Sequence, residues 1–185
     1  MGQPDGLTHL QVEVASIFFE LETSEGFLVA GGAALLASEL ITRPTEDLDL
    51  FASSPTTSVA EAKQTLIDAL EQRDHDVTVI QDRPTFCRMV VRRAGEEVLV
   101  DLAIDSPPRI APTITVLGPT LAPVELAGRK LLALFGRAEA RDFADVYLLV
   151  RRFGKEALLE QAASLDARLR PHGPRADDGN PWKVH

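Results

Sequence analysis

The sequence predicts an α/β (α+β) fold, in which helices flank a mixed sheet and a helical segment forms the C-terminal part. Three observations lead to this prediction. Stretches with apolar residues at helical spacing alternate with short apolar runs of strand length over most of the chain. Proline- and glycine-rich segments separate these stretches, and the C-terminal part contains only helical patterns. The 185 residues, 45% of them hydrophobic and 25% charged, suffice for one domain with a real core.

The N-terminal part predicts two helices, each followed by a strand. Thr8 and Gln11 form a capping box in front of an apolar stripe, and Gly26 ends this first helix. Pro44 prevents the second helix from continuing. The predicted elements are a helix over about 8–22, a strand over 27–30, a helix over about 33–40 and a strand over 47–51.

The rest of the chain predicts one more helix, a group of strands and the final helices. Ser58 and Glu61 form a second capping box, and Pro123 suits the first position of a helix that Gly136 should end. The predicted elements are a helix over 58–73, strands over 76–80, 86–92, 97–104 and 114–117, and helices over 123–135, 142–153 and 155–169. We therefore expect an α/β core over 1–118, a helical segment over 119–170 and a flexible tail over 171–185.

Charge and composition narrow the function classes. The formal net charge of -9 argues against non-specific binding of nucleic acid, which depends on neutralising phosphates. RNA remains possible as a substrate, because basic residues cluster at 88–93 and 129–141. The single cysteine, Cys87, excludes an internal disulfide and fits a reducing compartment. No segment has the pattern of a signal peptide or the length of a membrane span, so we predict a cytoplasmic protein without a membrane partner.

Two carboxylates, Asp47 and Asp49, lie one residue apart on the predicted strand 47–51. Alternate strand residues point to the same face, so these side chains project together while Leu48 and Leu50 project to the other face. Carboxylates that close repel each other unless a cation lies between them. Mg²⁺ commonly takes one or two carboxylates and completes its shell with water and substrate phosphates. The pair predicts a Mg²⁺ site for nucleotidyl transfer from an NTP; the alternative is a solvated strand end.

Gly31 and Gly32 lie between the strand 27–30 and the helix after it. Two glycines here would let a phosphate approach the backbone, with the positive end of the helix behind it. The alternative is a tight strand-to-helix turn, which a bare Gly-Gly pair does not exclude. The carboxylate pair downstream favours the phosphate site.

A third carboxylate, Asp101, stands inside the apolar run 98–104. Aspartate is depleted in strand interiors and rarely buried without a partner. With Asp47 and Asp49 it could surround two divalent ions, one for the attacking hydroxyl and one for the triphosphate. The alternative is an ion pair between Asp101 and an arginine such as Arg88.

Lys130 lies among apolar residues of the predicted helix 123–135, so its stem can follow the apolar surface while its ammonium reaches a cleft. There it could bind a triphosphate. Asp142 and Asp145 share a helix face and could hold Lys130 or Arg129 in position. Spacing alone favours the alternative, an ordinary charged helix surface.

Two sets of motifs occur in a fixed order. The first is Gly31-Gly32-Ala33-Ala34-Leu35 followed by Arg43-x-Thr45-x-Asp47-x-Asp49-Leu50-Phe51, and the second is Lys130-Leu-Leu-Ala followed by Arg141-Asp142-x-x-Asp145. Together they resemble the motifs of the AbiEii/MenT-type nucleotidyltransferases, toxins of type IV toxin–antitoxin systems. The resemblance covers about residues 27–150.

The resemblance implies a nucleotidyltransferase fold and transfer of NMP from an NTP to the 3′ acceptor end of tRNA, which blocks aminoacylation and translation. It also implies a cognate antitoxin protein as a partner. The candidate catalytic residues are Asp47, Asp49, Lys130 and Asp145; those for the nucleotide are Gly31, Gly32, Arg43, Thr45 and Lys130; those for Mg²⁺ are Asp47, Asp49 and Asp101. Two other functions stay open: nucleotide transfer to a small molecule or a protein, and a non-catalytic module of the same fold that binds a partner.

Overall fold

A computed structural model of the chain describes residues 6–53 and 57–166. At its centre lies a seven-stranded sheet with strand order β3-β4-β5-β2-β1-β7-β6. The strands are β1 (Phe27–Ala30), β2 (Asp47–Ala52), β3 (Asp76–Arg83), β4 (Phe86–Arg93), β5 (Glu96–Ile104), β6 (Thr113–Thr115) and β7 (Gly118–Thr120). The sheet is mixed, because β2 runs parallel to β5 and antiparallel to β1. The predicted α/β (α+β) class with a mixed sheet is confirmed.

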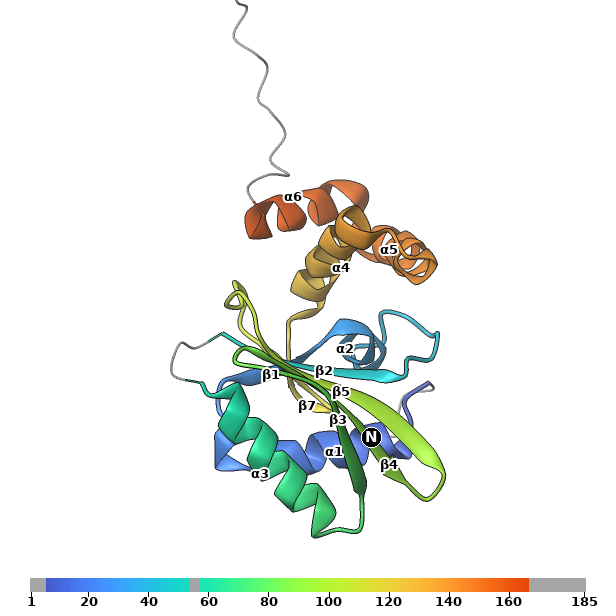
Figure 1. Cartoon of the computed structure of the whole chain (residues 1–185). Helices are drawn as coiled ribbons and strands as arrows, with labels where there is room; N and C mark the ends of the chain where they lie inside the picture. The colour runs from blue at the N-terminus through green and yellow to red at the C-terminus, as the bar shows by residue number, and fades with distance from the viewer. Residues whose placement is uncertain (1–5, 54–56, 167–185) are drawn as a thin grey trace, which may run out of the picture.

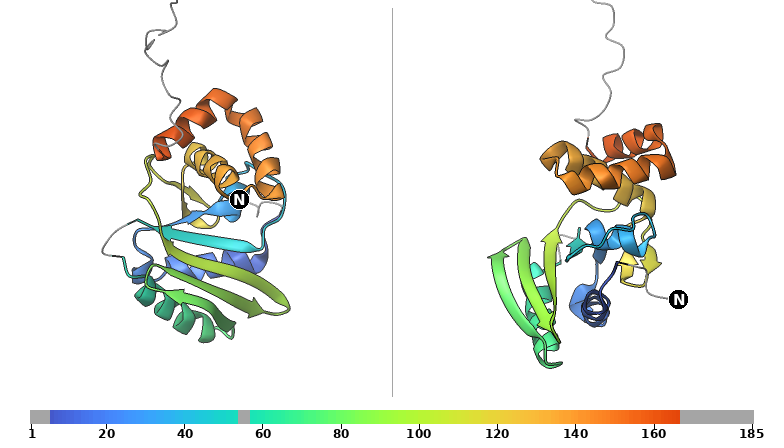
Figure 2. Two further views of the ribbon diagram at one scale, coloured as in Figure 1. Left: turned by 45° about the horizontal axis from the view of Figure 1, so that its top comes forward. Right: turned by 90° about the vertical axis from the view of Figure 1, so that its right-hand side faces the viewer.

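Helices cover both faces of the sheet (Figures 1 and 2). Helices α1 (His9–Phe19) and α3 (Val59–Glu71) pack on one face, with the short 3₁₀ helix η1 (Glu22–Ser24) between them in sequence. Helix α2 (Gly31–Ala37) lies on the other face and contacts α4 (Pro123–Arg137). Helix α4 in turn packs against α5 (Ala140–Phe153) and α6 (Lys155–Leu165), which form the helical C-terminal part.

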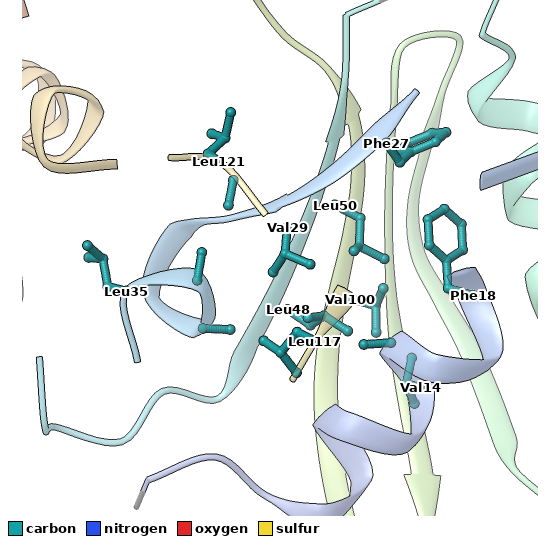
Figure 3. Packing of buried hydrophobic residues seen from close by; sticks show 14 of the residues in the cluster. Val14, Phe18, Phe27, Val29, Leu35, Leu48, Leu50, Val100, Leu117 and Leu121 are labelled. Carbon is teal, nitrogen blue, oxygen red and sulfur yellow. The ribbon is translucent and has the colours of Figure 1, made fainter. Parts of the chain in front are cut away.

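The core between the sheet and α1 fixes which way the β2 side chains point (Figure 3). Leu48 and Leu50 of β2 are fully buried against Val14 and Phe18 of α1 and neighbouring strand residues. Because strand residues alternate, Asp47 and Asp49 must project from the opposite face. That face is the one over which α2 and α4 lie. The predicted alternation along β2 is therefore confirmed.

Several predicted boundaries differ from the structure. Gly31 and Gly32 are not a turn before the second helix but the first residues of α2. Gly136 does not end α4, which continues to Arg137 and is closed by Ala138 in the left-handed region at φ 52°. The predicted strand 114–117 is instead a hairpin of β6 and β7, with Leu117 between them. The capping box of Thr8 and Gln11 is confirmed.

The division into a core over 1–118 and a helical segment over 119–170 stays a prediction, and the tail over 171–185 lies outside the described residues. Within residues 6–53 and 57–166, none of the helices combines the length and the apolar character that crossing a bilayer requires.

Candidate active site

A cleft of about 440 Å³ opens between the face of the sheet that carries Asp47 and Asp49 and helix α4. Eight of the nine predicted site residues line it: Gly31, Gly32, Arg43, Thr45, Asp47, Asp49, Asp101 and Lys130. The ninth, Asp145, is fully buried behind Arg43 and Lys130 and does not line the cleft. The fold therefore brings together residues that are up to about a hundred positions apart in the chain.

The carboxylates form a row across two neighbouring strands. Asp49 of β2 lies directly beside Asp101 of β5 in the parallel register, and Asp47 shares the face of Asp49 two residues earlier. Burial raises the pKa of Asp49 to about 6, and the negative charges of Asp101 and Asp47 add to this shift. A carboxylate in such surroundings is stabilised when a cation binds next to it.

Gly31 makes room for Asp49. Its φ is +64°, a conformation that side chains disfavour, and a Cβ there would lie 1.7 Å from Oδ2 of Asp49. A Cβ on Gly32 would lie 2.9 Å from Oγ1 of Thr45. The two glycines thus let the side chains of Asp49 and Thr45 lie directly against the start of α2, a close approach that a bare turn between two elements would not require.

The residues at this position fit Mg²⁺ with two protein ligands rather than three. Asp47 and Asp49 offer adjacent carboxylates, the donor set that Mg²⁺ combines with water and phosphate oxygens. Both oxygens of Asp101 instead accept hydrogen bonds from Arg88, at 2.8 Å and 2.6 Å. In the described part of the chain, no three His, Cys, Asp or Glu side chains have the arrangement of a metal site. Asp101 as a third ligand stays a prediction, since Arg88 would have to release it.

The opposite wall of the cleft carries cations that two buried aspartates hold. Lys130 of α4 lies 3.3 Å from Asp142 and 3.1 Å from Asp145, both on α5. Arg43 donates two hydrogen bonds to Asp145, from Nε at 2.7 Å and from Nη2 at 2.5 Å. Asp142 and Asp145 are therefore part of an inner ion network, and Lys130 is the partner they hold. Arg129 is held by Glu125 instead, at 2.9 Å.

Two further arginines complete this wall and were not among the predicted site residues. Arg137 donates to both oxygens of Asp142, at 2.8 Å and 3.0 Å. This hydrogen bonding, together with the charge of Lys130, lowers the pKa of Asp142 to about 2. Arg141 reaches across the cleft, with Nη1 3.3 Å from Oδ2 of Asp47. The sequence signalled Arg141 only through the basic cluster 129–141 and the Arg141-Asp142-x-x-Asp145 run.

Gln11 of α1 also supports the site from the other face of the sheet. Its buried side-chain amide donates to the carbonyl oxygen of Thr45 at 2.9 Å and to that of Asp47 at 3.3 Å. These bonds fix the backbone where β2 begins. The sequence assigned Gln11 only to a capping box, and nothing local to it indicates this second role.

Comparison with known proteins identifies the family. Residues 16–180 match the family described as "Nucleotidyl transferase AbiEii toxin, Type IV TA system". A comparison with curated proteins gave no match.

Solved structures show the same fold at low identity. JHP933 from Helicobacter pylori is 19% identical with a TM-score of 0.57, over 85% of this chain and 75% of that chain. ANT(2")-Ia, in complex with adenylyl-2"-tobramycin, is 13% identical with a TM-score of 0.58, over 87% of this chain and 99% of that chain. The Megavirus polyadenylate synthase is 14% identical with a TM-score of 0.53, over 78% of this chain and 32% of that chain. The chain has a nucleotidyltransferase fold and belongs to the AbiEii nucleotidyl transferase toxin family of type IV toxin–antitoxin systems.

Proposed function

We propose that this nucleotidyltransferase toxin transfers NMP from an NTP to the 3′ acceptor end of tRNA in a Mg²⁺-dependent reaction. The observation that carries the proposal is the division of charge across one cleft. Asp47 and Asp49 line one wall, and Arg43, Lys130, Arg137 and Arg141 line the other. A triphosphate with a bound divalent cation needs both kinds of partner. A tRNA that carries an extra nucleotide at its 3′ end can no longer be aminoacylated, so translation stops.

Each group has a distinct role in this proposal. Asp47 and Asp49 would hold Mg²⁺, which supplies charge neutralisation at the phosphates. Gly31, Gly32 and Thr45 shape the space for the phosphates, and Lys130 and Arg43 attract them. Asp145 does not line the cleft, so we assign it the positioning of Lys130 and Arg43 rather than contact with substrate.

The reaction is a displacement at the α-phosphorus. The 3′ hydroxyl of the acceptor loses its proton to solvent as its oxygen forms a bond to this phosphorus. The bond to the bridging oxygen of the β-phosphate breaks, and pyrophosphate leaves with that electron pair. The cations of the α4–α5 wall stabilise the charge that develops on the leaving pyrophosphate. Their ion pairs with Asp142 and Asp145 hold them in place before the substrate arrives, so little reorganisation is needed.

Two other acceptors remain candidates. The net charge of -9 would attract a cationic small molecule or protein. ANT(2")-Ia, which shares the fold, was solved with an adenylylated aminoglycoside. A non-catalytic module is disfavoured, because Asp47 and Asp49 are both present and line the cleft.

Labelling separates these functions. The purified protein is incubated with each α-³²P-labelled NTP, Mg²⁺ and total tRNA, or with aminoglycosides or protein extract in place of tRNA. Label at the tRNA 3′ end supports the proposal, and label only on another acceptor contradicts it. The absence of label on any acceptor would favour the binding module. Co-expression of a candidate antitoxin protein with the toxin then tests for the cognate antitoxin, which the type IV family implies.

A further inference from the structure

Arg88 of β4 adds a cation to the wall of the cleft that carries the acids of β2 and β5. It lies directly opposite Asp101 in the antiparallel register of β4 and β5, and Asp101 lies beside Asp49 in the parallel register of β5 and β2. Directly opposite residues of neighbouring strands share a face of the sheet. The three side chains therefore form a row, in which Asp101 stands between a cation and a candidate metal ligand.

The contact between Arg88 and Asp101 is built into the sheet. Nε and Nη2 of Arg88 donate to the two oxygens of Asp101, at 2.8 Å and 2.6 Å, which is the bidentate arrangement of a strong ion pair. The side chain of Asp101 is 9% exposed, whereas that of Arg88 is 40% exposed. Arg88 thus covers the carboxylate of Asp101 and is itself accessible from the cleft.

A second contact fixes the guanidinium of Arg88. The ring of Phe86, two residues earlier on the same face of β4, has its centroid 5.6 Å from Cζ of Arg88, within the range of a cation–π contact. Hydrogen bonding to Asp101 raises the pKa of Arg88, and the charges of Asp101, Asp47 and Asp49 act in the same direction. The guanidinium is therefore a permanent positive charge at a fixed place in the cleft.

The arginine that reaches Asp47 is held much less firmly. Nη1 of Arg141 lies 3.3 Å from one oxygen of Asp47, while its Nε donates to Glu139 at 2.6 Å. The side chain of Asp47 is also 28% exposed. A divalent ion at Asp47 has to displace one long hydrogen bond, whereas an ion at Asp101 has to displace two short ones. The available donors for an ion are therefore those of β2.

We propose that the guanidinium of Arg88 takes the place of a second divalent cation, so that the cleft binds one ion at Asp47 and Asp49. Asp101 then positions Arg88 and is not a metal ligand. Arginine and Mg²⁺ both stabilise the charge on a phosphoryl group during transfer. The N–H groups of Arg88 that Asp101 leaves free contact the α-phosphate when the acceptor oxygen attacks it. This inference rests on the proposed function, because it assumes that an NTP and Mg²⁺ bind in this cleft.

Counting bound Mn²⁺ tests the inference without turnover. Mn²⁺ replaces Mg²⁺ as a probe for electron paramagnetic resonance, and an α,β-methylene NTP analogue supplies the triphosphate in the absence of an acceptor. The variants are Arg88→Met, which keeps an apolar side chain beside Phe86, and the double variant Arg88→Met/Asp101→Asn. The matched control is Arg92→Met, because Arg92 forms a cross-strand pair with Glu97 at 2.6 Å on the same two strands, outside the lining of the cleft. Thermal unfolding is measured for every protein.

We expect the wild type and the Arg92→Met control to bind about one Mn²⁺ per chain. Arg88→Met frees the oxygens of Asp101, so about two Mn²⁺ should bind, close enough for their spectra to couple. In the double variant the count should return to about one, because the added ligand is lost. Transfer by Arg88→Met should fall about 10²-fold at low Mg²⁺ and recover as Mg²⁺ is raised, since a second ion then supplies the missing charge.

Three results would overturn the inference. Two coupled Mn²⁺ ions in the wild type would make Asp101 a metal ligand and leave the proposed function intact. A count of about one in folded Arg88→Met would show that Arg88 does not keep a second ion away. A wild type that binds no Mn²⁺ with the analogue would remove the inference together with the proposed Mg²⁺ site.

Two further outcomes keep the inference and the proposed function apart. If Arg88→Met failed to fold, the wild-type count would still decide, because one ion supports the inference and two contradict it. A count of one in the wild type and two in Arg88→Met would support the inference even if tRNA received no label. In that case only the proposed transfer to tRNA would fail.

Discussion

Asp49 of β2 and Asp142 of α5 belong to opposite walls of the same cleft, and their surroundings shift their pKa values in opposite directions. Burial and the neighbouring acids Asp101 and Asp47 raise the pKa of Asp49 to about 6. Hydrogen bonds from Arg137 and the charge of Lys130 lower the pKa of Asp142 to about 2. Aspartate therefore serves two different purposes on the two walls of the cleft. Asp49 leaves charge for a ligand to neutralise, whereas Asp142 and Asp145 are already paired and hold the cations of the site.

The two walls contribute differently to function and to stability. In the metal-free protein, the charge at Asp49 is a cost that the fold carries. The charges of Asp142 and Asp145 contribute to the fold, because their removal leaves the buried ammonium of Lys130 without its partners. Removing the charge of Asp49 should therefore raise the free energy of unfolding, whereas removing the charge of Asp142 or Asp145 should lower it.

The largest effect on activity is expected for Asp49→Asn. Nucleotide transfer should fall about 10³-fold or more, because the charge that binds the cation is lost. In EDTA the same variant should be more stable than wild type by about 1–2 kcal/mol, since a carboxylate held next to Asp101 and Asp47 is removed. Labelling and urea denaturation measure the two effects. Glu46→Gln, at an exposed position just before β2, is the control and should change neither. Full activity in Asp49→Asn would contradict the functional difference between Asp49 and the α5 acids.

The largest loss of stability is expected for Asp145→Ala. The change leaves Arg43 and Lys130 without their shared partner and should cost about 3–5 kcal/mol in the free energy of unfolding. Urea denaturation again provides the measurement. Glu139→Ala, which breaks an exposed ion pair with Arg141, should cost no more than about 0.5 kcal/mol. If Asp145→Ala proved as stable as wild type, the α5 acids could not be the support we assign to them.

The sequence predicts the parts of the two walls that depend on residues close together in the chain. It does not predict contacts between residues far apart in the chain. Asp47 and Asp49 could be placed on one face of a strand, because the strand period is local and Leu48 and Leu50 alternate with them. The pairing of Asp101 with Arg88 was an open alternative, and it follows once the strands 86–93 and 96–104 form a hairpin in register.

Other parts of the site depend on packing that no local pattern encodes. Arg43 meets Asp145 across 102 positions, and Arg141 meets Asp47 across 94. Gln11 reaches the carbonyl groups around β2 from a helix on the far face of the sheet. The predicted start of the second helix at residue 33 was wrong for a different reason. Glycine usually signals a turn, but α2 begins at Gly31, where the close approach of Asp49 requires a glycine.

A smaller effect is expected for Gly31→Ala. The positive φ and the contact of the new Cβ with Asp49 should destabilise the protein by about 1–3 kcal/mol and displace the carboxylate. Transfer activity should fall with it. Gly136→Ala is the matched control, because that glycine is in α4 with open space around its Cβ position. The control should be neutral or more stable by up to about 1 kcal/mol. Equal effects of the two changes would mean that the space beside Asp49 is not restricted.

The smallest effect concerns pH. The pKa of Asp142 is lower in the folded protein than in the unfolded chain, so its contribution is present above about pH 4 and is lost as the pH falls towards 2. We expect Asp142→Asn to flatten the acid limb of stability against pH by about 1–2 kcal/mol. Thermal unfolding between pH 2 and 5, in roughly half-unit steps, measures it. Parallel curves for variant and wild type would contradict the assignment.

Calorimetry of Mg²⁺ binding, in the presence of a non-hydrolysable NTP analogue, tests the central claim most directly. The wild type and Glu46→Gln should bind Mg²⁺ with the analogue, and Asp49→Asn should lose this binding. Near pH 6, close to the raised pKa of Asp49, the measured enthalpy should depend on the buffer, because cation binding favours the ionised carboxylate and releases protons. Equal Mg²⁺ affinity in Asp49→Asn and wild type would show that the β2 carboxylates do not form the cation site.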